Sequence, residues 1–313
     1  MSPRRPTLAD LRRRIDRIDE AIHRDLIRRT EVVELVKDLK KNERVKIRPG
    51  READILYRLV RRHRGPFPVA ELVRVWREII VATLRFEGPF TVAVHAPHGQ
   101  GGIWDLARDQ YGSFTPMTRH EGARAVIRAV AARRTTVGVL PLPEADEDDP
   151  WWPDLMPAPG NTRERASNIA PLSGRAWIIA KLPFASAGNA RGPAIGALAI
   201  APAMPDASGR DRTCVGLATD DKTGHEDVVR VFAKAGLGRP EPIGVENPQV
   251  PGGLLWLADL PGFVREDDPR LATLRSALGN KRARVVVLGA YAEPLGPAEL
   301  APKAREKRKA KRP

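Results

Sequence analysis

The sequence predicts a multidomain fold of three parts and a tail: an all-α unit, an α/β region, an α+β module of ferredoxin-like order and a basic tail (residues 1–89, 90–210, 211–295 and 296–313). Three observations predict it. Apolar residues recur every three or four positions through the first forty residues, which is typical of an amphipathic helix. After Gly88 and Pro89, short apolar runs alternate with helical stretches. From Thr213 onward the order is strand, helix, strand, helix, strand.

A single long helix is predicted from Thr7 to about Lys41, a stretch that contains no Gly or Pro. Thr7 followed by Asp10 is an N-cap signal, with Asp in place of the Glu or Gln of a full capping box. Such a helix is about 50 Å long, more than a small unit needs by itself. We therefore expect it to pack against a second copy of itself, through the apolar positions Leu8, Leu11, Ile15, Ile18, Ile22 and Leu26.

Two shorter helices complete the first unit. A loop is predicted over residues 42–50, a helix over 51–64, a Gly/Pro break over 65–68 and a third helix over 69–87.

The rest of the chain reads as alternating strands and helices. In the α/β region the pattern predicts strands at 90–95, 136–140, 176–180 and 197–201, and helices at 103–111 and 120–133. In the last module it predicts helices at 225–235 and 269–278 and strands from 213, near 243, and at 254–260 and 284–288. The final dozen residues have no apolar face and are predicted to be disordered.

Charge is concentrated at the two ends of a chain whose net charge is +14. Residues 1–90 hold 23 Lys or Arg against 14 Asp or Glu, and residues 302–313 hold seven against one. This distribution points to an anionic partner, either a nucleic acid or a small polyanionic metabolite, and composition does not choose between them.

The sequence excludes a disulfide scaffold, because Cys214 is the single cysteine. A single cysteine fits a protein of a reducing compartment. No stretch approaches the roughly 18 apolar residues that span a bilayer, and the charged N-terminus lacks a signal-peptide core. We expect a cytoplasmic protein with no membrane partner.

The long helix carries cations in a register suited to a small anion. Arg29 and Lys40 are 11 residues apart, which leaves them about 20° from alignment and about 16 Å apart along the axis. Two long side chains from these positions can hold one small molecule. Arg12 lies 17 residues before Arg29, some 25 Å away, so it can join the same site only from another chain.

The runs LADLRRRIDRIDEAIHRDLIRRTEVVELVKDLK, RPGREADILYRL and VWREIIVATLRFEGPF resemble the all-helical type of chorismate mutase. The resemblance covers about 80 residues. It implies an interlocked homodimer of three-helix protomers that converts chorismate to prephenate, in aromatic amino-acid biosynthesis, without a cofactor or a metal.

The same resemblance implies roles for seven residues. Arg12 of the partner chain and Arg29 would hold the two substrate carboxylates, and Lys40 would donate to the ether oxygen of the breaking bond. Arg51 would add positive charge, and Glu52 would accept from the ring hydroxyl. Thr83 stands where the family often has Ser, and Glu87 where many members have Gln. The residues expected to act in catalysis are Lys40, Glu87 and Arg29.

A pericyclic step needs no nucleophile and no proton transfer, so a protein accelerates it by holding a compact conformer and stabilising developing charge. Glu87 departs from the family pattern, because only its protonated form can donate to the ether oxygen. We therefore expect turnover to fall as pH rises and the carboxyl loses its proton. Arg48 is a second departure, since some relatives carry an acidic residue there.

The α/β region resembles a degenerate prephenate dehydratase domain of periplasmic-binding-like fold, on the runs FTVAVHAPHGQGGIWDLARDQYG and VGVLPLPE. Gly196, Ala197 and Leu198 stand where that family's Thr-Arg-Phe motif is expected. The last module resembles an ACT regulatory domain, on VFAKAGL and VVVLGAYAEP, which implies a possible aromatic amino-acid effector. The layout resembles the bifunctional mutase–dehydratase known as the P-protein.

Three alternatives follow for the whole chain. The first is a chorismate mutase whose second region keeps an effector or scaffolding role. The second is a working bifunctional mutase–dehydratase. The third is a nucleic-acid-binding protein that uses the two basic zones, although the first unit lacks interleaved aromatics and a helix-turn-helix signal.

His95 and His98 lack further ligands at suitable spacing, so we expect a turn there and not a metal site.

Overall fold

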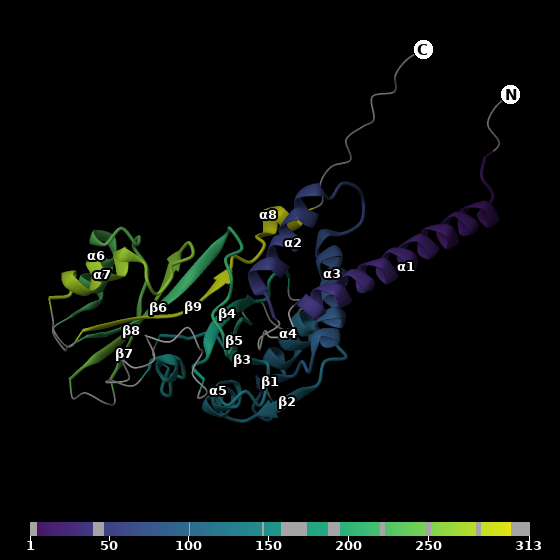
Figure 1. The fold of residues 1–313 in the computed structure, drawn as a ribbon. Helices are drawn as coiled ribbons and strands as arrows, with labels where there is room; N and C mark the ends of the chain where they lie inside the picture. Colours follow the sequence, from purple (N-terminus) through teal and green to yellow (C-terminus); the bar gives the residue numbers. More distant parts are fainter. Residues whose placement is uncertain are drawn as a thin grey trace, which may run out of the picture.

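The computed structural model describes residues 5–39, 47–99, 101–145, 147–157, 174–186, 195–219, 223–247, 252–279 and 283–301. Three helices come first, and the rest of the described chain builds one nine-stranded sheet with helices on both faces (Figure 1). The all-α unit followed by an α/β region is the order that the sequence predicts.

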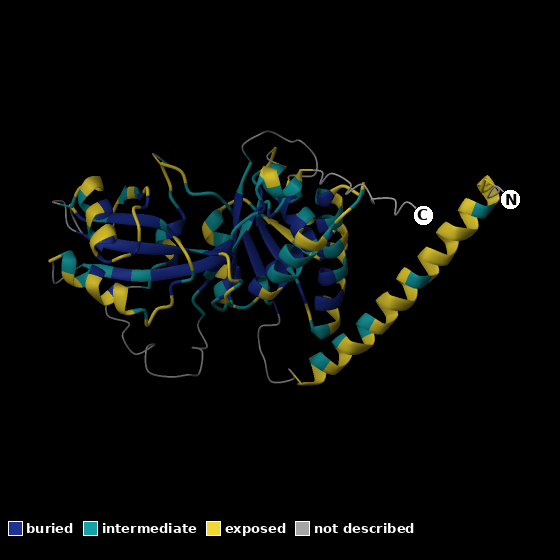
Figure 2. Cartoon of the chain, turned by 90° about the horizontal axis from the view of Figure 1, so that it is seen from above, coloured by how far each residue is buried: buried dark blue, intermediate teal, exposed yellow. Residues whose placement is uncertain are grey.

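The first helix, α1 (Leu8–Leu39), extends away from the body of the protein (Figure 1). Its N-terminus has the predicted cap: the backbone N–H of Asp10 donates to Thr7 Oγ1 at 3.2 Å, and the N–H of Thr7 donates to Asp10 Oδ2 at 2.9 Å. None of its described residues is buried, and Figure 2 shows exposed positions along its whole length.

The other two helices pack against the body. They are α2 (Pro49–Arg62) and α3 (Val69–Glu87), and α3 has the bounds that the sequence predicts. Both bury one face, in contacts with each other and with the α/β region: α3 packs on α4, and α2 packs beside the end of strand β9.

The sheet has the order β2-β1-β3-β5-β4-β9-β6-β8-β7. Its first three strands in this order are parallel, whereas β5 runs antiparallel to both β3 and β4. The strands are β1 (Val92–His95), β2 (Met117–His120), β3 (Val137–Pro141), β4 (Trp177–Leu182), β5 (Ala197–Ala201), β6 (Asp211–Thr219), β7 (Ile243–Glu246), β8 (Leu254–Pro261) and β9 (Arg284–Ala292).

Two cores lie on opposite faces of the first five strands. Helices α3 and α4 (Gly102–Tyr111) cover one face, where α3 contributes Ile80, Val81 and Leu84. Helix α5 (Ala123–Ala131) covers the other face together with Trp151 and Trp152, which a short 3-10 helix, η1 (Trp152–Leu155), places in the core. The two buried tryptophans thus anchor the acidic segment that precedes them.

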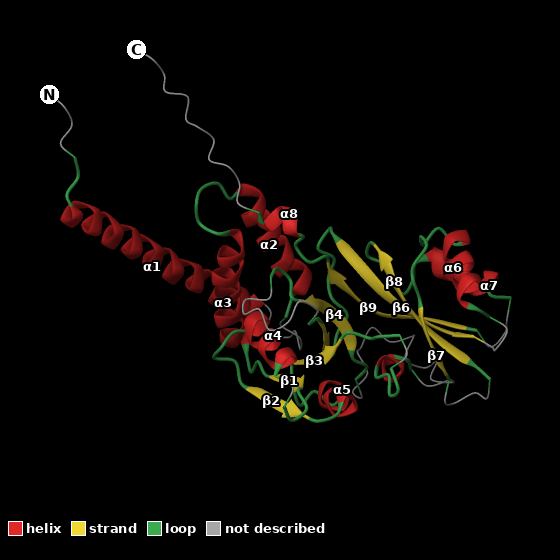
Figure 3. Ribbon diagram, turned by 180° about the vertical axis from the view of Figure 1, so that it is seen from behind, coloured by secondary structure: helices red, strands yellow, loops and turns green. Residues whose placement is uncertain are grey.

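The last module has the ferredoxin-like order β6-α6-β7-β8-α7-β9, with the sheet order β9-β6-β8-β7. Helices α6 (His225–Lys234) and α7 (Pro269–Ala277) pack on one face of it (Figure 3). Its assignment to the ACT class stays a prediction.

The sheet continues across the boundary predicted at residue 210, because β9 pairs with β4 in parallel at Ile178 and Gly289. Gly289 has a φ of +144°, and a Cβ there would overlap the backbone of Ile178. A glycine is therefore required for the two strands to approach each other.

Three elements differ from the sequence-based expectations. The helix predicted over 120–133 is present as α5, which starts after Gly122, but the strand before it, β2, was not predicted because the polar edge strand Met117–His120 has no alternating apolar pattern. Strand β9 continues past Leu288 to Ala292, since Gly289 masks the strand signal. A short helix, α8 (Pro297–Leu300), lies in the segment predicted as tail.

The disorder predicted for the last dozen residues concerns residues 302–313, which lie outside the described residues. No helix in the part of the chain that the structure describes is long and apolar enough to cross a membrane.

Candidate functional site

The structure brings together Arg29 of α1 and Thr83 of α3. Arg29 is half-buried, and its Nη1 donates to Thr83 Oγ1 at 3.2 Å. The Thr83 hydroxyl is oriented by its own helix, because it donates back to the carbonyl oxygens of Ile80 at 2.8 Å and Ile79 at 3.2 Å. The contact fixes the end of α1 against α3 and places a guanidinium beside a hydroxyl, a combination suited to a carboxylate.

Glu87 lies one helical turn after Thr83, on the same face of α3. Its Oε2 is buried and has no hydrogen-bond partner among the described residues. A buried acceptor without a donor is costly, so this oxygen offers an acceptor position to a donor from beyond the described residues. Lys40, the predicted donor to the ether oxygen, lies outside the described residues.

Two further predicted cations are exposed. Arg12 lies on the projecting part of α1 and is not near Arg29 of its own chain, since the 17 residues between them span about 25 Å. Arg51 lies in the first turn of α2, where its Nη1 pairs with Asp54 at 2.9 Å. The protomer thus brings together Arg29 and Thr83 but leaves Arg12 outside their surroundings.

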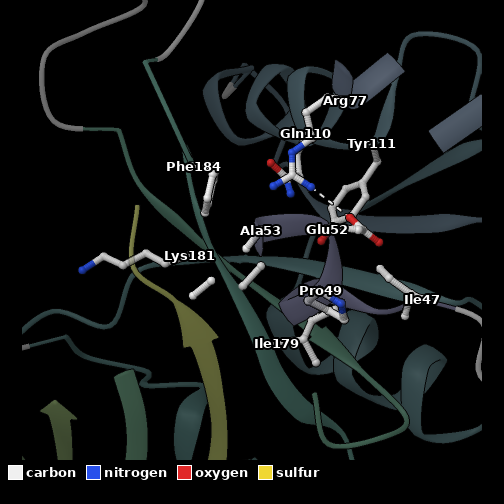
Figure 4. A pocket seen from close by; sticks show the side chains of 12 residues that line it. Ile47, Pro49, Glu52, Ala53, Arg77, Gln110, Tyr111, Ile179, Lys181 and Phe184 are labelled. Carbon is white, nitrogen blue, oxygen red and sulfur yellow. Dashed lines mark hydrogen bonds and ion pairs between the residues drawn. The ribbon is translucent and has the colours of Figure 1, made fainter. Parts of the chain in front are cut away.

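Glu52 lies in a buried cluster between α2 and the α/β region (Figure 4). Its Oε2 accepts from Arg77 Nη1 at 2.9 Å, and both side chains are buried. Burial raises the pKa of Glu52, and the Arg77 guanidinium offsets part of that rise. The Oε1 atom of Glu52 is buried without a partner in the described chain, and Glu52 is one of the residues that line a cavity of about 10 Å³. This is room for about one water molecule.

Sequence reasoning missed Arg77 and the residues around it. On α3, Arg77 occupies a position in the buried stripe of Val73, Ile80 and Leu84, so a charged residue on an apolar helical face was the available signal. Its other neighbours, Gln110 and Phe184, come from distant parts of the chain and could not be found by spacing.

The segment that contains these residues has a counterpart among known families. Residues 11–88 match the family chorismate mutase type II. This segment belongs to the type II chorismate mutase family. The match begins one residue before Arg12 and ends one residue after Glu87, so it contains every residue for which a role was predicted.

Curated relatives match a longer stretch than the mutase segment. The bifunctional chorismate mutase/prephenate dehydratase of Aquifex aeolicus is 32% identical over 140 residues, which is 43% of this chain and 38% of that protein. The bifunctional enzyme of Pseudomonas aeruginosa is 30% identical over 146 residues, or 45% of this chain and 40% of that one. The chain therefore matches less than half the length of these relatives.

A solved structure with a similar arrangement is the prephenate dehydratase of Streptococcus mutans, with a TM-score of 0.42 and 11% identity, covering 66% of this chain and 100% of that one. A protein described as a novel type of quorum-quenching acylase, GqqA, also has a TM-score of 0.42, with 15% identity over 66% of this chain and 96% of that one. Likenesses at this level say nothing about function.

The α/β region offers little polar chemistry at the place where the mutase–dehydratase layout predicts a Thr-Arg-Phe motif. Strand β5 there consists of Ala and branched apolar residues only, and all of them are buried. No group of three or more His, Cys, Asp or Glu side chains that could hold a metal ion occurs among the residues described. Neither a hydroxyl nor a guanidinium is available from this strand.

Proposed function

We propose that the helical unit catalyses the rearrangement of chorismate to prephenate, and that it does so as an interlocked homodimer. The observation that carries the proposal is the contact of Arg29 with Thr83 inside a segment of this family, beside a Glu87 oxygen that has no donor within the described part of the chain. A cation and a hydroxyl fit a carboxylate of the substrate, and the Glu87 carboxyl, when protonated, fits its ether oxygen.

The mechanism is electrostatic. Arg29 and the partner chain's copy of Arg12 hold the two carboxylates and so select the compact conformer in which the new bond forms. Lys40 and protonated Glu87 donate to the ether oxygen, where negative charge develops as the old bond breaks. Arg51 adds positive charge near the carboxylates, and Glu52 accepts from the ring hydroxyl. No proton is transferred between substrate and protein, and no cofactor takes part.

The apolar side of α1 supports the dimer. Large apolar side chains are exposed along the helix, with exposed fractions from 36% at Leu26 to 89% at Leu39, and a monomer would leave this surface in water. A second copy covers it and brings Arg12 toward the pocket of its neighbour. The exposed side chains are Leu8, Leu11, Ile15, Ile18, Ile22, Leu26, Ile27, Val32, Leu35 and Leu39.

Loss of chorismate, followed by absorbance, tests the proposal with Arg29→Ala and Lys40→Ala. Each variant is expected to turn over roughly 10²–10³ times more slowly than the wild type, the typical effect of losing one positioned donor. Arg28→Ala is the matched control, because Arg28 is the exposed neighbour that pairs with Asp25 at 3.4 Å. Equal rates in all four proteins would discard the site.

A second activity, prephenate dehydration, is a candidate because the match to the bifunctional relatives is longer than the helical unit. The apolar composition of β5 argues for a different role, in which the α/β region serves as a scaffold or binds an effector such as an aromatic amino acid at the last module. Incubation of the purified protein with prephenate distinguishes an active dehydratase from a scaffold or effector-binding region. Formation of phenylpyruvate would make the protein bifunctional.

A further inference from the structure

We propose that the end of α2 and the C-terminal segment form one surface that binds the phosphate backbone of a nucleic acid, whatever its base sequence. The surface consists of the arginine cluster, Arg61, Arg62 and Arg64, and of the basic tail, residues 302–313. Neither part has a role in the proposed mutase reaction. The inference is therefore a further activity, and it is tested independently of that reaction.

The positive charge of the helical unit is concentrated in one short stretch. Residues 40–64 hold ten Lys or Arg against three Asp or Glu, whereas the 39 residues before them hold ten against eight. Both carboxylates of α2 already have cationic partners, since Glu52 pairs with Arg77 at 2.9 Å and Asp54 pairs with Arg51 at 2.9 Å. They therefore leave the charge of the arginine cluster uncompensated.

The arginine cluster is exposed at the C-terminal end of α2. Arg64 is held just beyond the helix, because its Nη1 donates to the carbonyl oxygens of Arg61 at 2.8 Å and His63 at 2.7 Å. Within the described part of the chain, none of the three arginines forms an ion pair. The partial negative charge of a helix C-terminus favours a cation in the last turn, but it falls off within that turn and does not account for further cations beside it.

The basic tail begins beside this cluster. It follows α8, which Figure 1 shows next to α2. Arg210 joins the two helices, because its guanidinium pairs with Glu299 of α8 at 2.7 Å and lies 4.5 Å from the centre of the Tyr57 ring of α2. Leu300 packs against the apolar core that contains Val60 in the last turn of α2. The tail, with seven Lys or Arg against one Glu, therefore starts where the arginine cluster lies.

The chemistry of this surface fits an extended polyanion. Positive charges brought together from opposite ends of a sequence repel each other, and an anionic partner removes the repulsion. The cluster is exposed and does not enclose a small molecule. A nucleic-acid duplex presents one negative charge per about 1.7 Å of its length, and a guanidinium can donate twice to a phosphate. Such a partner can meet the cluster and the tail at the same time.

The composition of the tail favours a nucleic acid over a membrane and predicts binding without sequence preference. Residues 302–313 contain no Leu, Ile, Val, Met or aromatic residue. The tail therefore has no apolar side chain to bury in a lipid layer and no aromatic ring to stack on a base. Contacts to phosphates position a protein but carry no information about base sequence.

Binding of the full-length protein to a fluorescently labelled DNA duplex of about 20 base pairs, followed by anisotropy at increasing salt, tests the inference. The association constant of the wild type should fall linearly with salt on a double-logarithmic plot. In the cluster variant, all three arginines of the cluster are replaced by alanine. Its slope should be shallower by about 2.7, because each lost phosphate contact removes about 0.9.

A tail variant removes the same number of charges from the other half of the surface, by the substitutions Lys307→Ser, Arg308→Ser and Lys309→Ser. Its slope should also be shallower by about 2.7, and the two variants combined should lose about 5.4, because both halves contact the same duplex. The matched control removes three exposed arginines from α5, α6 and the loop before α7, by Arg128→Ala, Arg230→Ala and Arg265→Ala. It should keep the wild-type slope.

Each contrary outcome overturns the inference. A cluster variant with the wild-type slope shows that the tail binds without α2. A control that loses as much as the cluster variant shows an effect of net charge only. If vesicles of equal parts phosphatidylglycerol and phosphatidylcholine bind the protein and the duplex does not, the partner is a membrane. Should circular dichroism show that the cluster variant does not fold, the tail variant decides, since an unchanged slope there is equally contrary. Chorismate turnover is measured separately, so a failure here leaves the proposed function standing.

Discussion

The first helix and the two that follow it belong to one unit but have opposite surroundings. None of the described residues of α1 is buried, and its apolar side is exposed to solvent. Helices α2 and α3 bury an entire face against the α/β region, including the charged pair of Glu52 and Arg77. The catalytic groups proposed here are divided between the two environments.

This difference shows that the proposed pocket has two separate supports. Arg12 and Arg29 are carried by α1, whose exposed apolar side we propose that a second copy covers. Glu52, Thr83 and Glu87 are carried by helices that the rest of the same chain already fixes. Substitutions on the apolar side of α1 should therefore act through assembly, whereas substitutions on α2 and α3 should act within one protomer.

The largest effect is expected from a charge in the middle of the apolar side of α1. Ile18 is 57% exposed in the protomer, and Ile18→Asp would place a carboxylate in the dimer interface. We expect a monomer without measurable mutase activity, because Arg12 then has no neighbouring pocket to enter. Sedimentation equilibrium and chorismate loss measure the two consequences.

Glu20→Ala is the matched control for this substitution. Glu20 lies two residues further on, on the opposite side of the helix, with its side chain 68% exposed. It should leave both the dimer and the activity intact. An Ile18→Asp protein that stays active as a monomer would show that mutase activity does not depend on a dimer formed through α1.

The local features of the helical unit could be predicted from the sequence. The bounds of α3 follow from Pro68 and Gly88 on either side of a helical apolar pattern, and the Thr7 cap follows from a hydroxyl three residues before a carboxylate. Both depend on neighbours within a few positions. The pairing of Arg29 with Thr83, 54 residues apart, could be anticipated only through the family resemblance.

The features that sequence reasoning missed depend on distant residues. Glu52 was predicted to accept from the substrate's ring hydroxyl. Its pairing with Arg77, and the contact of Arg77 with Gln110, require α2, α3 and α4 to meet in three dimensions. The same holds for Gly289, which reads as an interruption of a strand but permits the approach of β4 to β9. Contacts between elements, more than the elements themselves, could not be predicted from the sequence.

An intermediate effect, confined to one protomer, is expected at Glu87. If its protonated carboxyl donates to the ether oxygen, wild-type turnover falls from acid to mildly alkaline pH, and Glu87→Gln, a permanent donor, gives a flat profile. Glu71→Gln is the control, since Glu71 is an exposed carboxylate in the first turn of the same helix. A flat wild-type profile would show that Glu87 does not act as the donor.

The smallest effect is expected at the free end of α1, where the cap is local and exposed. Thr7→Ala removes the acceptor for the Asp10 N–H and the partner of the Asp10 carboxylate, so the first turn should fray. Far-UV circular dichroism should record a small loss of helicity, with mutase activity close to wild type because Arg12 lies beyond the first turn. Thr30→Ala is the control, because the Thr30 hydroxyl only bonds back to the carbonyl of Leu26 within the helix. If Thr7→Ala instead lowers activity as far as Ile18→Asp does, the capped end of α1 is itself part of the dimer interface.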